Sequence, residues 1–166
     1  MTTLTPFHLT PLGLFHTLVS LACVVSAFMA LARYKEISPK TRLGQVYLGT
    51  LVITTLTGFP IFRHGKAGPP HVLGVITLVV LTIAAFAETT RLFGGASTYV
   101  KTISYSMTVF FLMIPTVTET LTRVPVGAPI VASPESPVFG PLYAALLVIF
   151  LIGAGLQVRT LRRRGR

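Results

Sequence analysis

The chain has 166 residues, of which 52% are hydrophobic and only 11% are charged, and its mean hydropathy is +0.76. A soluble domain carries about 25% charged residues and cannot hide so much apolar surface at this size, so the composition excludes an ordinary soluble fold. The formal net charge of +10 does not indicate a nucleic-acid partner, because the basic residues stand at the ends of apolar segments, where they set membrane topology.

Five apolar segments follow one another along the chain, and each has about the length of a bilayer-spanning helix. The predicted spans are residues 11–32, 43–62, 71–88, 103–121 and 138–158. The fourth is rich in Ser and Thr and contains Pro115, so we expect a kinked helix buried among the others. The pattern predicts an all-helical (all-α) integral membrane bundle that forms a single transmembrane domain, residues 1–166, within the lipid bilayer.

The lysines and arginines between these segments predict the orientation. Eleven of them fall on the side that holds the C-terminal tail and three on the opposite side. The basic side is assigned to the cytoplasm, which places the N-terminus outside and the C-terminus inside. The first ten residues lack a basic region, so we expect the first segment to remain as a span rather than act as a signal peptide. We expect a multi-pass protein of the bacterial inner (plasma) membrane.

His16 is the first candidate for chemistry, because polar groups inside a membrane are costly and imidazole is a common ligand of haem and metals. It shares a helical stripe with Ser20, Cys23 and Ala27, a small and polar face that we expect to contact other helices. Two interpretations stay open. His16 binds a haem, a metal or a quinone, or it forms a hydrogen bond with a neighbouring helix.

His71 and Glu119 are the other candidates near the same outer level. His71 begins the third segment after Gly68-Pro69-Pro70, and it either pairs with His16 or caps its own helix. Glu119 completes a set of two imidazoles and one carboxylate that suits a divalent metal, or it forms an ion pair with Arg123 four residues later. Of the remaining histidines, His64 is expected to be solvated or to face lipid headgroups, and His8 is expected to be incidental.

Several further polar residues have structural interpretations as well as functional ones. Glu88 is expected to form an ion pair with Arg91 at the inner end of the third segment. One face of the second segment carries a tyrosine and three threonines, which either line a wet cavity or bond their own backbone: Tyr47, Thr50, Thr54 and Thr57. Since no nucleophile and base can be assembled from the sequence, enzyme activity stays open.

The motifs of the central part resemble those of an uncharacterised family of bacterial multi-pass membrane proteins. The shared features are a histidine in the first helix, an R-x-L-G-x-x-Y-like stretch, a G-x-x-H stretch and a Ser-Tyr helix that ends near Thr-Arg-x-Pro. In this chain they correspond to His16, the segment from Arg42 to Tyr47, His71, Ser104-Tyr105 and the residues around Glu119. The resemblance covers about residues 12 to 125 and implies a helical membrane fold. The chain departs from the family where Lys40 and Ser97 replace histidines on the inner side.

Two functions follow as hypotheses. In the first, the chain is a redox-linked membrane protein in which His16 and His71, together with Glu119 in the metal version, hold haem b, a metal or a quinone near the outer face. In the second, it is a non-catalytic accessory or assembly subunit of a larger membrane complex. Its docking surfaces would then be the last span, with Gly153 and Gly155, and the proline-rich connection over residues 122–137.

Overall fold

A computed structural model of the chain describes residues 10–61, 67–90 and 92–164. Over these residues it is all-helical, with no strand. The elements in chain order are α1 (Pro11–Tyr34), α2 (Arg42–Gly58), α3 (Pro69–Thr89), the short 3-10 helix η1 (Gly94–Ala96), α4 (Ser97–Arg123) and α5 (Phe139–Arg164). The predicted fold class is confirmed to this extent.

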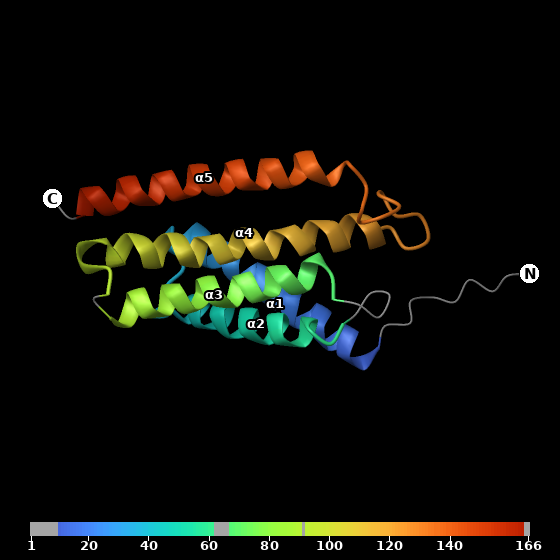
Figure 1. The fold of residues 1–166 in the computed structure, drawn as a ribbon, viewed down its shortest axis with the longest axis horizontal. Coiled ribbons are helices and arrows are strands. Elements are labelled where there is room, and N and C mark those ends of the chain that lie inside the picture. The colour runs from blue at the N-terminus through green and yellow to red at the C-terminus, as the bar shows by residue number, and fades with distance from the viewer. Residues whose placement is uncertain (1–9, 62–66, 91, 165–166) are drawn as a thin grey trace, which may run out of the picture.

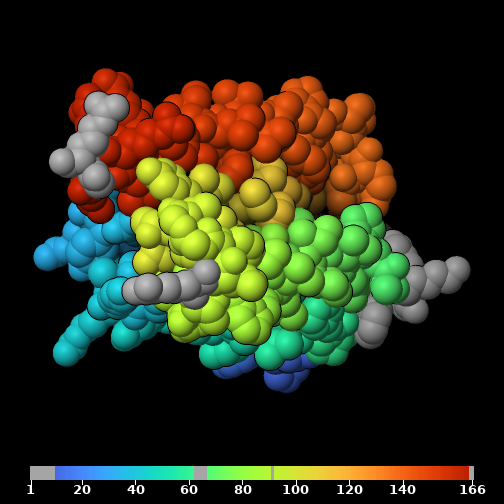
Figure 2. All heavy atoms as spheres, turned by 60° about the vertical axis from the view of Figure 1, so that its left-hand side comes forward, coloured from blue at the N-terminus to red at the C-terminus, as the bar shows by residue number. Residues whose placement is uncertain are grey.

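The long helices run along one axis and alternate in direction (Figure 1). α1 packs along α2, and α3 packs along α4, while α5 contacts α4 alone among the helices. In the space-filling view α5 forms one edge of the molecule (Figure 2). The start of α1 and the end of α5 therefore lie at opposite ends of the bundle. All described lysines and arginines except Arg123 belong to the end that holds the α1–α2 and α3–α4 connections and the last turns of α5. This end is called the inner end below, and the opposite end is called the outer end.

The helix starts follow from local sequence. The Thr10 hydroxyl accepts the Gly13 N–H at 3.0 Å, and the Thr41 hydroxyl accepts the Gly44 N–H at 3.1 Å, as N-cap side chains do. Prolines occupy the first turns of α1 and α3, where their missing N–H groups cost nothing.

Within the residues that the structure describes, four helical segments are long and apolar enough to cross a membrane: Pro11–Tyr34, Pro69–Thr89, Gly94–Arg123 and Phe139–Arg164. The predicted span over residues 43–62 is shorter in the structure. Its helix, α2, has 17 residues and ends at Gly58, so it is about 26 Å long against about 30 Å of hydrocarbon core. Pro60 explains this end, because a proline lacks the N–H that would continue the helical hydrogen bonds.

Two other boundaries differ from the predicted ones by more than two residues. α4 begins at Ser97, six residues before the predicted start at 103, because its first turns are polar and hydropathy does not reveal them. α5 continues to Arg164, six residues beyond the predicted end at 158, because arginines are good helix formers and suit the negative end of the helix dipole.

The core lies among α1 to α4. The predicted stripe on α1 does face other helices, since Cys23 and Ala27 are fully buried. Tyr47 of α2 is also fully buried, and its hydroxyl lies 2.8 Å from the Thr108 hydroxyl of α4. Because Thr108 donates its own proton to the Tyr105 carbonyl, the tyrosine is the donor.

Outward-facing side chains are largely apolar. Leu18 of α1, Val72 of α3 and Ile149 of α5 are 58%, 61% and 66% exposed. Such surfaces are costly in water and favourable against lipid chains. Among the four apolar segments, the one that contains α4 is the most buried and α5 the least, as expected for a buried fourth span. These helices are those of a membrane protein, and their exposed apolar faces suit a lipid environment.

Polar contacts tie the helices together at the inner end. The Glu88 carboxylate, at the end of α3, lies 3.2 Å from the Lys40 ammonium and 2.8 Å from that of Lys101. The Glu36 carboxylate lies 3.6 Å from the Arg164 guanidinium. These contacts, called the inner ion pairs below, link α3, α4 and α5 to the α1–α2 connection. The predicted partner of Glu88, Arg91, lies outside the described residues.

Candidate functional site

His16 lies on α1, half-buried, and contacts the last turn of α2. Its Nδ1 is 3.0 Å from the Thr57 hydroxyl, which is itself 2.8 Å from the Ile53 carbonyl. A threonine hydroxyl has one proton, and the carbonyl takes it, so we assign the His16 Nδ1–H as the donor to Thr57. This tautomer leaves a lone pair on Nε2.

His71 lies at the start of α3, and both of its ring nitrogens contact backbone. The Gly68 N–H donates to Nδ1 at 3.1 Å, and Nε2 is 3.0 Å from the Phe59 carbonyl. Because Nδ1 accepts a hydrogen bond, it carries no proton, so the neutral ring is protonated at Nε2 and Nε2–H donates to the Phe59 carbonyl. The predicted alternative, a histidine that caps its own helix, is therefore confirmed. Any metal at either nitrogen of His71 would displace one of these bonds.

The two histidines meet at the same turn of α2. The His16 ring lies against Gly58, where an added Cβ would be 3.4 Å from its Cε1, and His71 holds the carbonyl of the next residue, Phe59. The Phe59 ring packs over Gly74 of α3, where an added Cβ would lie only 3.1 Å away. We call these contacts the outer histidine clamp. They fix the end of α2 between α1 and α3.

Glu119 lies on α4 near its outer end and forms an ion pair with Arg123. The predicted alternative for Glu119 is thus confirmed. His16 lies in the second turn of α1 and Glu119 in the last turns of α4, so both belong to the outer end of the bundle. Within the described residues, however, no three His, Cys, Asp or Glu side chains are grouped closely enough to hold a metal ion. His8 and His64 lie outside the described residues.

The polar face of α2 is mostly satisfied by its own helix. Thr50 donates to the Val46 carbonyl at 2.6 Å, and Thr57 donates as described above. Thr54 differs, because its hydroxyl is buried and finds no partner in the described part of the chain. The backbone bonds predicted as one alternative are therefore present at Thr50 and Thr57.

Gln157 is a key residue that the sequence interpretation missed. It is 9% exposed on α5, its Oε1 accepts the Ser106 hydroxyl of α4 at 3.0 Å, and its Nε2 donates to the Lys35 carbonyl at 2.8 Å. Lys35 has a left-handed backbone with φ of 62°. A signal was present, since a lone glutamine between apolar residues of a membrane helix usually faces another helix.

Comparisons with protein-family models, with curated proteins and with solved structures find no match for this chain. The resemblance to an uncharacterised membrane family therefore stays a prediction. Its motif residues nevertheless have clear structural places, because Gly44 permits a close backbone contact, Tyr47 fills the core, and His16 and His71 form the outer histidine clamp.

Proposed function

We propose that the chain crosses the bacterial plasma membrane five times, with its N-terminus outside and its inner end in the cytoplasm. Two observations support this. α2 packs along α1 in the opposite direction, so it traverses the bundle although it is short, and a short span is accommodated by local thinning of the bilayer. The basic residues gather at the inner end, as the positive-inside rule requires of a cytoplasmic side.

Labelling with a membrane-impermeant maleimide tests this topology. The native Cys23 is fully buried and should not react. A cysteine at exposed Ala132, in the outer connection, should be labelled in intact cells, whereas one at exposed Thr160, near the end of α5, should be labelled only after permeabilisation. The reverse pattern would contradict the orientation.

We further propose that the protein is a non-catalytic subunit of a larger membrane complex. The observation that carries this proposal is the outer histidine clamp: the side chains best suited to chemistry hold helices together. Glu119 and Glu88 are likewise in ion pairs. The outward faces of these helices are apolar, and such faces can pack against the helices of a partner protein.

Gentle solubilisation tests the subunit role. A native gel of the mildly solubilised membrane should show the 17.9 kDa chain in one discrete complex of fixed composition. Recovery of the chain only as a free monomer under several mild detergents would contradict the proposal.

The redox role remains the second candidate, and one observation favours it. Thr57 fixes the His16 ring through Nδ1 and leaves the Nε2 lone pair available, an arrangement that second-shell partners give to ligating histidines. In this tautomer Nε2 can ligate iron or another metal, or accept a hydrogen bond from a quinol hydroxyl. Haem b held between His16 and His71 would in addition require His71 to release one of its backbone bonds.

A further inference from the structure

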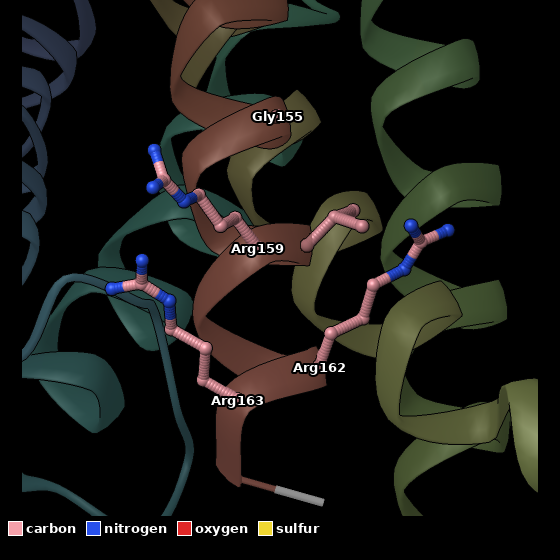
Figure 3. A pocket seen from close by; sticks show the side chains of 5 residues that line it. Gly155, Arg159, Arg162 and Arg163 are labelled. Atoms are coloured by element: carbon pink, nitrogen blue, oxygen red, sulfur yellow. The ribbon is translucent and has the colours of Figure 1, made fainter. Parts of the chain in front are cut away.

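A shallow hollow of about 300 Å³ lies on the surface of α5 near its C-terminal end. It is lined by Gly155, Val158 and three arginines, Arg159, Arg162 and Arg163, called the hollow arginines below. Figure 3 shows Arg159 and Arg163 extending to one side of α5 and Arg162 to the other. The space over Gly155 is open, because a Cβ there would meet nothing within 4 Å. The hollow thus combines an apolar floor with a cationic rim.

The positive charge of this rim is not balanced by the protein. The carboxylates described at the inner end belong to Glu36 and Glu88, and both are engaged in the inner ion pairs. The hollow arginines are exposed, and none has a carboxylate partner in the described part of the chain. An anionic group from outside the chain would therefore meet guanidinium groups that have no ion pair to displace, those of Arg159 and Arg163 on one side of α5 and that of Arg162 on the other.

The position of the hollow along α5 indicates which kind of anion can reach it. α5 has 26 residues and is about 39 Å long, which exceeds the about 30 Å of hydrocarbon core. The apolar run of this helix ends at Val158, so the hollow arginines lie at the depth of the lipid headgroups. Guanidinium groups bind phosphate oxygens in pairs of parallel hydrogen bonds, with a geometry that lysine lacks.

We propose that the hollow binds the phosphate of an anionic phospholipid between the hollow arginines, with an acyl chain lying over Gly155 and Val158. This rests on α5 crossing the membrane and not on the protein being a subunit of a complex. A neutral phospholipid fits less well, because its own ammonium group compensates the phosphate.

Lipid titration followed by native mass spectrometry of the purified full chain tests the proposal. Phosphatidylglycerol should bind at lower concentration than phosphatidylcholine. The Arg159→Gln and Arg163→Gln changes should each raise the apparent Kd for phosphatidylglycerol about 5-fold, which corresponds to about 1 kcal/mol for each basic residue near the surface. Gly155→Leu, which fills the floor without changing charge, should also weaken binding.

Arg42→Gln is the matched control, because Arg42 is an exposed basic residue at the same end of the bundle but on α2. It should leave the apparent Kd unchanged. Equal weakening by Arg42→Gln would show diffuse charge attraction and overturn the proposal. Equal binding of phosphatidylglycerol and phosphatidylcholine would overturn it too. Binding of an acidic polypeptide to these arginines, without binding of phosphatidylglycerol, would also overturn it. The substituted residues are exposed, and circular dichroism verifies that each variant keeps its helix content.

Discussion

Gly44→Ala should destabilise the protein strongly, although alanine is the better helix former. Gly44 lies in the first turn of α2, and a Cβ added there would be 1.9 Å from the Ser38 carbonyl oxygen and 3.0 Å from the Thr41 hydroxyl. Ordinary contact begins near 3.4 Å, so the carbonyl must retreat by about 1.5 Å, a displacement of the kind that overpacking forces on a backbone.

The magnitude follows from what that movement breaks. The Ser38 carbonyl accepts both the N–H and the hydroxyl of Thr41 at 3.1 Å, and the same hydroxyl caps α2. Two hydrogen bonds at about 1 kcal/mol each and a cap at about 1 kcal/mol are lost. Alanine returns about 1 kcal/mol of helix propensity. The expected net loss is about 2 kcal/mol.

Gly49→Ala is the matched control in the same helix, because a Cβ at Gly49 meets nothing within 4 Å. Unfolding of both variants is measured in mixed micelles by titration with sodium dodecyl sulfate, followed by circular dichroism. Gly44→Ala should unfold at clearly lower detergent fraction than the parent, and Gly49→Ala should not. If the two alanine variants proved equally stable, the close approach of Ser38 to α2 would be refuted.

Three further substitutions can be followed by the same unfolding titration. Gln157→Leu should lower the free energy of unfolding by about 1–3 kcal/mol, because it removes two hydrogen bonds between segments at about 0.6–1.7 kcal/mol each. The control Leu156→Ala changes a neighbouring side chain that is 58% exposed, and it should have little effect. Equal losses in the two variants would contradict the bridging role of Gln157. Lys35→Gly should stabilise by about 1 kcal/mol, because glycine adopts the left-handed backbone that lysine adopts at a cost; a loss of stability would show that the lysine side chain matters more. Tyr47→Phe should cost about 1 kcal/mol, because it removes the donor to Thr108; no change would mean that this bond contributes nothing net.

The sequence predicted the helical bundle and the end of the bundle at which each polar residue lies, because apolar runs and helical spacing are local properties. The place of His16 on an inward-facing stripe was predictable in this way, and so was the ion pair of Glu119 four residues from Arg123. The early end of α2 also had a local signal in Phe59-Pro60, which hydropathy over residues 43–62 concealed.

Contacts between distant segments were not predictable. The Lys35 carbonyl meets Gln157, which is 122 residues away in the chain, and nothing near Lys35 indicates its left-handed backbone. Similarly, the sequence placed His71 at the start of a helix but could not show that its second nitrogen holds the Phe59 carbonyl, since this depends on how α2 ends beside α3. Both contacts depend on how the helices pack against one another, and no short stretch of the sequence reveals that packing.

The central claim is that His16 and His71 hold helices rather than a cofactor, and one measurement tests it most directly. The protein is purified in mild detergent, an oxidised-minus-reduced absorption spectrum is recorded, and metal content is determined on the same sample. The account predicts no haem band and no copper, iron or zinc near one atom per chain. A haem band or a stoichiometric metal that disappears in both His16→Ala and His71→Ala, while circular dichroism shows both variants folded, would contradict it.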